Sequence, residues 1–436
     1  MISAISQQEL GWFTTRSRTA KVRSMREFAE SEIIIPDGPF ESRRLKCHRQ
    51  PYTGLWFDAI DSGNWNRFVA TGPTQSGKSL ACFLVPLLYH LFEIGETVIC
   101  GLPDMDMAQD KWREDILPVI EKSRYCDLMP SRGGGSRGGK VDAIRFLNGA
   151  TLKFMSGGGG DKSRAGFTSR VLVISETDGM DKSGATSRES DKVTQLEART
   201  RAYGSRKRIY LECTVSTQQG RTWQEYQNGT RSRILLPCPY CLHWVTPERE
   251  DLLGWQDAES QVAARDRGMF HCPDCKEAWS EQQRADANRE CQLIHEGQQI
   301  DAQGETTGEA CRTETLGFRW SAVNNMFLQS ADIAADEWRA SRSPDEENAE
   351  REMRQFVWCL PVLPSQWEET AITAEEITRR LAIWPQSVLP PNTRDLTAAI
   401  DLGKHLCHWI VVAWGLHAEC HIVDYGRIEV ASSDLG

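Results

Sequence analysis

Gly72-Pro73-Thr74-Gln75-Ser76-Gly77-Lys78-Ser79 decides the fold of this chain, because it matches the whole pattern G-x-x-x-x-G-K-[ST]. In this pattern the glycines let backbone N–H groups turn toward a phosphate, the lysine faces the β- and γ-phosphates, and the serine hydroxyl binds Mg²⁺. An apolar run at 68–70 precedes the motif and a helix-like stretch at 80–91 follows it. This strand-to-helix context favours a nucleotide-phosphate site over an ordinary glycine-rich turn.

The composition is that of a globular chain with 436 residues, of which 40% are hydrophobic and 26% charged, enough for two or three domains. We expect no membrane association, because no apolar run approaches the roughly 20 residues of a membrane span and residues 1–10 do not form a signal peptide. The cysteine pattern favours a reducing compartment, the cytosol. A net charge of -10 argues against a surface that is basic throughout, although basic clusters leave room for a local groove that binds nucleic acid.

A second apolar run, Val171-Leu172-Val173-Ile174, has the character of a parallel strand buried on both faces, and it ends in Ser175-Glu176-Thr177-Asp178. Open α/β sheets bind ligands at this end of their strands. We predict that Glu176 polarises the attacking water during nucleotide hydrolysis. Ser175 stands where such sites usually carry an Asp for Mg²⁺. Either its hydroxyl holds a Mg²⁺-bound water, or Asp178 reaches the site, or hydrolysis is weakened.

Two further stretches are open to two interpretations each. The strand-like run 208–213 ends in Thr214-Val215-Ser216-Thr217, whose hydroxyls either sense the γ-phosphate or cap the next helix. Upstream of the phosphate-binding motif, Arg49-Gln50-Pro51-Tyr52 either places a glutamine against the adenine or forms a polar turn.

Two C-x-x-C pairs, Cys238-Pro239-Tyr240-Cys241 and Cys272-Pro273-Asp274-Cys275, indicate a closed four-cysteine metal site. A site with no open coordination position is structural, and Zn²⁺ is the expected ion. Iron in a rubredoxin-like site is the alternative metal, and a disulfide pair or four free thiols are the alternatives without metal.

The C-terminal region contains a linker-like stretch at 385–392, followed by three short strands at 396–401, 407–414 and 419–424. Asp401 ends the first of these strands, where an RNase H-like nuclease carries its first metal ligand. Few residues follow Asp401, so we expect an incomplete nuclease domain without endonuclease activity.

The order of these motifs resembles the large subunit of tailed-phage DNA-packaging terminase, specifically the lambda-type (GpA) family. The resemblance extends over nearly the whole chain. It rests on the segments 72–79, Ser163-Arg164, 171–178, 199–208, Thr214-Val215-Ser216, 236–241 and Ala398-Ala399-Ile400-Asp401.

The resemblance implies an ATP-driven motor that moves double-stranded DNA into a procapsid in the host cell cytoplasm. Its implied cofactors are ATP, Mg²⁺ and Zn²⁺, and its implied partners are a small terminase subunit, the portal and further copies of the chain. By the same resemblance, Lys78 and Ser79 hold phosphates and Mg²⁺, and Glu176 is the hydrolytic carboxylate. Thr214 lies in a coupling segment, and Arg164 is an arginine finger or a structural ion-pair partner. Asp401 is a nuclease metal ligand. A helicase or remodelling ATPase and an assembly subunit with weak turnover are the alternative functions.

The expected fold is therefore α/β: a RecA-like (ASCE) P-loop NTPase sheet with a Cys₄ zinc-ribbon insertion and the start of an RNase H-like domain. The predicted division is an N-terminal helical arm at 1–38, an ATPase domain at 39–235, a zinc ribbon at 236–290, a connecting segment at 291–392 and the nuclease region at 393–436.

Overall fold

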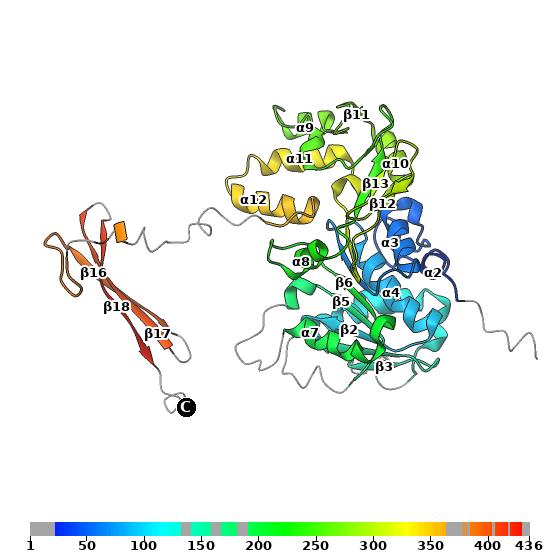
Figure 1. Ribbon diagram of the computed structural model, residues 1–436, viewed down its shortest axis with the longest axis horizontal. Helices are drawn as coiled ribbons and strands as arrows, with labels where there is room; N and C mark the ends of the chain where they lie inside the picture. Colours follow the sequence, from blue (N-terminus) through cyan, green and yellow to red (C-terminus); the bar gives the residue numbers. More distant parts are fainter. Residues whose placement is uncertain are drawn as a thin grey trace, which may run out of the picture. The chain divides into compact units, whose positions relative to one another are not determined.

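The computed structural model describes residues 22–131, 141–157, 167–180, 191–362, 378–379, 381, 384–402, 406–416 and 419–429. The chain forms two compact units, Met1–Leu363 and Pro364–Gly436, which we describe separately (Figure 1). The predicted boundaries at 38, 235, 290 and 392 remain predictions. None of the helices in the described residues is both long and apolar enough to cross a bilayer.

The first unit is built on a seven-stranded sheet with the order β15-β1-β6-β5-β2-β4-β3. All neighbouring strands are parallel except β3 and β4, which form an antiparallel pair. The strands are β1 Arg67–Thr71, β2 Val98–Leu102, β3 Ala143–Arg145, β4 Thr151–Ser156, β5 Val171–Ser175, β6 Arg208–Glu212 and β15 Thr315–Arg319.

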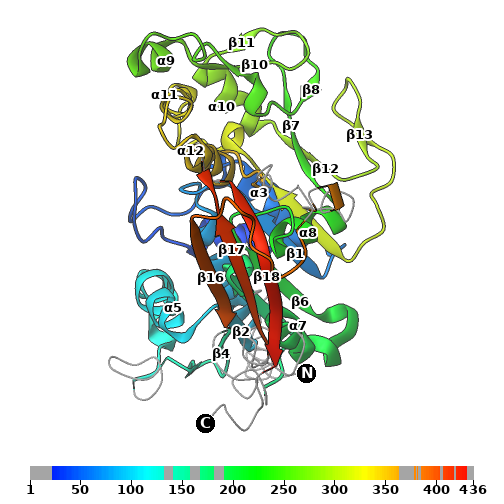
Figure 2. The same cartoon turned by 90° about the vertical axis from the view of Figure 1, so that its left-hand side faces the viewer.

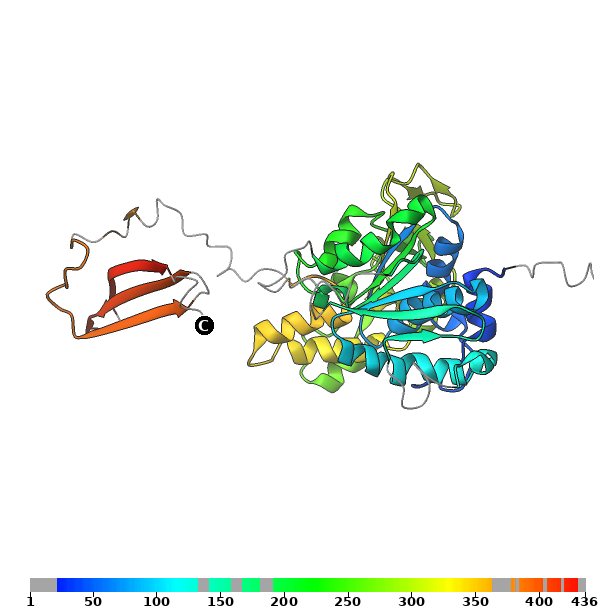
Figure 3. The same cartoon turned by 90° about the horizontal axis from the view of Figure 1, so that it is seen from below.

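The strands β1, β2, β5 and β6 are buried on both faces, as continuous apolar runs predict. Successive residues of β5 alternate between two hydrophobic clusters: Val171 and Val173 belong to the larger one, and Leu172 and Ile174 to the smaller one. Helices on both sides cover these faces (Figure 3). The sheet therefore holds the C-terminal ends of its parallel strands at a common edge.

The helices that surround this sheet include the one predicted after the phosphate-binding motif, which runs without a break through η2 Ser79–Leu84, α4 Val85–Leu88 and η3 Tyr89–Ile94. The others are α2 Met25–Glu32, η1 Cys47–Arg49, α3 Tyr52–Asp61, α5 Met105–Asp110, η4 Lys111–Ile116, α6 Leu117–Glu121, η5 Arg124–Leu128, η7 Thr177–Met180, α7 Lys192–Glu197, η8 Ala198–Arg206 and α8 Arg221–Asn228.

Sequence and structure differ most at two places in this unit. Helix α2 buries Met25, Phe28 and Ala29 in the larger cluster, so this part of the N-terminal arm belongs to the packed body. Strand β15, within the segment expected to be a connector, pairs in parallel with β1 along five residues. Its Leu316 and Phe318 are fully buried, and this apolar burial is what holds β15 at the edge of the sheet.

The region between β6 and β15 contains small sheets and short helices; much of it lies in green at the top of Figure 2, and its last strands lie lower on the right in yellow-green. They are β7 Arg233–Pro237, β8 Trp244–Val245, η9 Arg249–Asp251, β9 Leu252–Leu253, α9 Gln261–Arg267, β10 Met269–His271, β11 Ala278–Trp279, α10 Glu281–Arg289, β12 Gln292–Ile294, β13 Gln299–Ile300 and β14 Thr306–Thr307. After β15 the unit continues with η10 Ala322–Asn324, α11 Ser330–Ala340, α12 Glu346–Glu352 and η11 Met353–Val357.

The second unit contains a three-stranded antiparallel sheet with the order β16-β17-β18. Its strands are β16 Asp395–Leu402, β17 Leu406–Trp414 and β18 Cys420–Glu429, and they confirm the three strands predicted from the sequence.

Candidate functional site

The loop at 72–79 joins β1 to η2 at the C-terminal edge of the sheet, as predicted. Gln75 and Gly77 adopt positive φ angles of 54° and 84°, so the backbone is left-handed at two of three successive residues. Thr74 and Gln75 are exposed at its tip, and within the described residues the backbone N–H groups of 75–77 donate no hydrogen bond. Unpaired N–H groups at a helix N-terminus are suited to bind an anion.

The underside of the loop is held by residues from distant parts of the chain. Trp320 donates a hydrogen bond from Nε1 to Ser76 Oγ (3.2 Å), and Gly72 lies so close to its indole that a Cβ atom there would be 2.0 Å from a ring carbon. Gln50 and Tyr52 both donate to the Ser76 carbonyl, at 3.1 and 3.0 Å. Because Gln50 is buried and bonded beneath the loop, the structure favours a structural role for it over an open adenine contact.

The Lys78 side chain is buried in an ion pair that the sequence analysis did not predict. Its Nζ lies 2.6 Å from Glu212 Oε2, and the two side chains are 8% and 1% exposed. Ser175 donates a hydrogen bond from Oγ to Glu212 Oε1 (2.6 Å). Glu212 therefore connects the loop lysine with the end of the acidic strand.

The two charges stabilise each other. Burial alone would lower the pKa of Lys78, but the charge and hydrogen bond of Glu212 outweigh it and raise this pKa above its ordinary value. Burial would likewise raise the pKa of Glu212, yet Lys78 and the Ser175 hydroxyl hold it below its ordinary value. Both groups are therefore charged at neutral pH.

Glu176 follows β5 at a positive φ of 55°, a conformation that costs energy in a residue with a side chain. The side chain is half-buried, and the thiol of Cys213 lies 3.6 Å from Oε2. The charge of Glu176 also contributes to the raised pKa of Lys78, which indicates that the two groups face the same space.

Asp178 is bonded away from Lys78. Its Oδ1 accepts hydrogen bonds from the backbone N–H (2.8 Å) and hydroxyl (2.6 Å) of Thr222 in the first turn of α8, and its Oδ2 accepts one from the Ser216 hydroxyl. This network caps α8. The structure thus favours a structural role for Asp178 over the alternative that it reaches the nucleotide site.

The segment 214–217 follows β6 and lies against the end of the first unit. The Ser216 carbonyl accepts hydrogen bonds from Gln355 Nε2 (2.9 Å) and from the Val362 backbone (3.0 Å). At the tip of the loop, the Thr74 N–H donates to the Phe356 carbonyl (2.9 Å). The loop and the segment after β6 thus contact the same stretch, 355–362. The role predicted for Thr214 stays a prediction.

Arg164 and Ser163 lie outside the described residues. Asp401 lies on β16 in the second unit, where its side chain is exposed and its register partner across the sheet is His408. The structure therefore brings together Lys78, Ser175, Glu176 and Glu212 at the C-terminal edge of the large sheet, and Ser79 follows Lys78 in the chain. Asp401 belongs to the other unit.

The four predicted cysteines converge, and their sulfur atoms all lie within 4.8 Å of one another. Cys238 Sγ is 3.7 Å from Cys275 Sγ, and Cys241 Sγ is 3.8 Å from Cys272 Sγ. These distances exceed a disulfide bond and agree with the roughly 3.8 Å separation that Zn–S bonds of about 2.3 Å produce in a tetrahedron.

The two cysteine turns have the same backbone geometry. The Leu242 and Lys276 N–H groups donate to the Cys238 and Cys272 carbonyls, both at 3.0 Å, and both donors have a φ of 64°. The Tyr240 and Asp274 N–H groups donate to the Cys238 and Cys272 sulfur atoms, at 3.5 and 3.4 Å. Such turns present thiolates to a metal ion, so the residues fit Zn²⁺.

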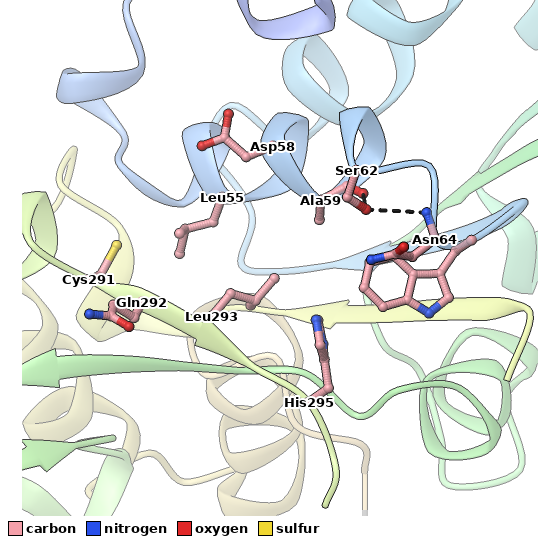
Figure 4. A pocket seen from close by; sticks show the side chains of 10 residues that line it. Leu55, Asp58, Ala59, Ser62, Asn64, Cys291, Gln292, Leu293 and His295 are labelled. Atoms are coloured by element: carbon pink, nitrogen blue, oxygen red, sulfur yellow. Dashed lines mark hydrogen bonds between the residues drawn. The ribbon is translucent and has the colours of Figure 1, made fainter. Parts of the chain in front are cut away.

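A separate pocket of about 310 Å³ lies between α3 and β12 (Figure 4). None of the loop, strand-end or cysteine residues described above lines it. It is formed by Leu55, Asp58, Ala59, Ser62, Asn64, Trp65, Cys291, Gln292, Leu293 and His295.

Two family models match this chain. The model of the ATPase domain of phage terminase large subunit gpA matches residues 41–292, which is more than half of the chain, and the model of the endonuclease domain of the same subunit matches residues 315–434. The second match includes both β15 and the whole β16–β18 sheet. The expectation that endonuclease activity is absent is therefore not supported, since it rested only on the few residues after Asp401.

Solved structures give more distant matches. The large terminase of bacteriophage HK97 is 13% identical, with 94% of this chain and 68% of that chain covered and a TM-score of 0.43. A large terminase from a thermophilic bacteriophage is 10% identical, with 88% and 68% covered and a TM-score of 0.39. The ATPase domain of the Thermus phage P74-26 large terminase is 15% identical, with 40% and 68% covered and a TM-score of 0.30. A search of curated protein sequences gave no match.

Proposed function

This chain belongs to the phage terminase large subunit gpA family and is an ATP-driven DNA-packaging motor, and we propose that residues 72–79 form the loop at which it binds and hydrolyses ATP. The observation that carries this proposal is the convergence of Lys78, Ser175, Glu176 and Glu212 at the C-terminal edge of one parallel sheet. Open α/β sheets bind their ligands at this edge.

In this proposal the N–H groups of 75–77 and the Lys78 ammonium bind the phosphates, and the remaining residues of the loop, Gly72, Pro73, Thr74 and Ser79, hold its shape and the cation. Bound Mg²⁺ would neutralise phosphate charge, and the Ser79 hydroxyl with the Ser175 and Glu212 side chains offers the oxygen donors that it prefers. Glu176 accepts the proton of the attacking water. Thr214 lies in the segment that senses the γ-phosphate and couples its presence to DNA movement. Arg164 is an arginine finger.

ATP hydrolysis stimulated by double-stranded DNA tests this proposal. We expect Lys78→Ala to lose nucleotide binding, whereas Glu176→Gln should keep the affinity for ATP and lose at least about 100-fold in turnover, because only the proton acceptor is removed. Glu225→Gln, which removes an acid that pairs with Arg67 at 2.7 Å, is the matched control. Equal hydrolysis rates in wild-type protein and Lys78→Ala would reject the proposal.

The four cysteines, Cys238, Cys241, Cys272 and Cys275, are proposed to hold one structural Zn²⁺. The equal geometry of the two turns and the tetrahedral sulfur spacing support this. A closed site of four thiolates leaves no position for a substrate, so the ion would stabilise the fold and take no part in hydrolysis.

An endonuclease activity is proposed for the second unit, with Asp401 as a metal ligand. The match of the endonuclease domain model and the exposure of Asp401 on β16 support it. Nicking of plasmid DNA with Mn²⁺ is the test, and we expect Asp401→Ala to abolish it. Asp395→Ala, at the other end of the same strand, serves as control. Undiminished nicking by Asp401→Ala would contradict this role.

The partners proposed from family membership are double-stranded DNA, a small terminase subunit, the portal of a procapsid and further copies of this chain, all in the host cell cytoplasm. Co-purification of the full chain with each candidate partner tests these assignments one by one.

A further inference from the structure

Glu212 occupies the central position at the edge of the sheet. It ends β6, which lies between β1, the strand leading into the loop, and β5, the strand ending at Ser175. The register places Glu212 beside Ser175 on one side and beside Ala70 on the other. Its carboxylate therefore projects into the site from between the two strands that carry the predicted nucleotide residues.

Both carboxylate oxygens of Glu212 are bonded to residues of this site, one to the Lys78 ammonium and one to the Ser175 hydroxyl, each at 2.6 Å. With 1% of the side chain exposed, water cannot compensate this negative charge. A buried carboxylate without a cation is strongly unfavourable. Lys111 also acts on the charge of Glu212, but its Nζ is paired with Asp115 at 2.8 Å, so Lys78 is the cation that Glu212 contacts in this state of the molecule.

Nucleotide binding changes the partner of Lys78. The loop lysine is the group that contacts the β- and γ-phosphates in sites of this sequence pattern, so Lys78 is drawn from Glu212 toward the phosphates. Glu212 then requires another cation at the same place. Protein sites for Mg²⁺ with nucleotides contain one or two carboxylates beside phosphates and waters, and Ser175 supplies only a hydroxyl at the end of β5.

We propose that Glu212 is the acidic residue of the Mg²⁺ site, and that it exchanges Lys78 for the cation that arrives with the nucleotide. The carboxylate that β5 lacks at Ser175 is thus supplied from the neighbouring strand. This inference rests on the proposed function, namely ATP binding at 72–79.

The test compares the affinity of the full chain for a fluorescent ATP analogue in Mg²⁺ and in EDTA. We expect Mg²⁺ to tighten binding to the wild-type chain, and Glu212→Gln to reduce this enhancement at least tenfold. Binding in EDTA should stay equal or become tighter, since Lys78 is no longer held away from the phosphates. A purely structural role of Glu212 would weaken binding in both conditions alike.

The matched control is Glu96→Gln. It removes an acid paired with Arg170 where β2 and β5 begin, at the N-terminal ends of the parallel strands. This variant should keep the tightening of analogue binding by Mg²⁺ that the wild-type chain shows. A rescue variant, Ser175→Asp with Glu212→Gln, moves the acid to the adjacent strand and keeps the buried charge. We expect it to restore most of the enhancement. If Glu212→Gln alone does not fold, this double variant carries the test, and loss of the enhancement in it overturns the inference.

Failure of the role of Glu212 and failure of the nucleotide site give different binding results. A wild-type chain that binds the analogue through Lys78, together with an unchanged Mg²⁺ enhancement in Glu212→Gln, would overturn the role of Glu212 alone. A wild-type chain that binds no analogue in either condition would overturn the proposed nucleotide site itself.

Discussion

At the scale of single residues, the site is organised by an ion pair whose members lie on different elements. Lys78 lies at the end of the loop and Glu212 ends β6, and both are almost completely buried. Removal of one member of such a pair costs much more than removal of both, because the remaining charge has no partner.

We therefore predict that Lys78→Met lowers the free energy of unfolding by about 3–5 kcal/mol in the absence of nucleotide. The double variant Lys78→Met with Glu212→Gln should lose clearly less than the sum of the two single variants. Urea denaturation of the four proteins at pH 7 gives this double-mutant cycle. Additive losses would show that the two side chains do not interact.

The residue scale also shows which parts of the site could be predicted from the sequence. The loop, Glu176 and the four cysteines belong to local patterns whose spacing alone indicates their chemistry. Glu212 belongs to no such pattern. Its position at the end of a strand-like run was the available signal, but only the strand order, which brings β6 between β1 and β5, connects it with Lys78.

At the scale of elements, the region around the turns 238–241 and 272–275 contains little regular structure of its own. Its strands β8 to β11 are two or three residues long. Strands this short do not form a stable sheet by themselves. Their Leu252, Phe270 and Trp279 are buried in the larger hydrophobic cluster, and a bound metal would add further local folding free energy.

We expect one Zn²⁺ per chain by metal analysis of the purified protein, and less than half of that in Cys272→Ser. A chelator should lower the melting temperature of the wild-type protein but change that of Cys272→Ser much less. Cys126→Ser, at an exposed cysteine remote from the ribbon in sequence, is the control for removal of a thiol. Equal zinc content in both variants would contradict the assignment.

The end of β12 carries a histidine that links stability to pH. Burial lowers the pKa of His295 from 6.5 to about 4, and its ring contacts Ser232 Oγ (2.8 Å) and the edge of Trp65. Between these two pH values the unfolded chain binds a proton that the folded chain does not, so stability falls as the pH is lowered through this window.

We predict that His295 lowers the free energy of unfolding at pH 4.5 by about 1–2 kcal/mol relative to pH 7, after allowance for the exposed part of the ring. Unfolding of wild-type protein and His295→Gln at pH 7 and pH 4.5 measures it. The pH-dependent loss in the variant should be smaller by this amount, while an identical loss in both proteins would exclude His295 as its source.

The strand of the large sheet that the sequence assigned to a connector is β15, which pairs with the distant strand β1. The run at 315–319 contains a glycine and only two large apolar residues, so it resembles part of a connector. It becomes a strand because its Leu316 and Phe318 complete the apolar face beside β1. Local patterns contain no information about such a parallel pairing.

At the scale of the whole molecule, both hydrophobic clusters lie within the first unit, and the buried apolar residues described in the second unit are Cys407, Ala413 and Val423. The buried members of both hydrophobic clusters end at Trp358, before the boundary at 363/364. The ion pair of Lys78 and Glu212 and the four cysteines also belong to this unit.

We predict that residues 1–363, produced alone, fold and bind ATP with an affinity within about threefold of the full chain, because the described contacts of the loop lie within the first unit. Calorimetry and nucleotide titration of the fragment check this, with the fragment carrying Lys78→Ala as control. A fragment that is unfolded, or folded but unable to bind ATP, would contradict it.

The contact between Gly72 and Trp320 also sets a condition on synthesis of the protein. The indole that supports the loop, together with β15, leaves the ribosome long after the loop itself. At about 5–20 residues per second, roughly ten seconds to a minute passes between the two events. During this interval the loop of the nascent chain lacks its contact with Trp320, so we expect it to bind ATP well only after β15 and Trp320 have been synthesised.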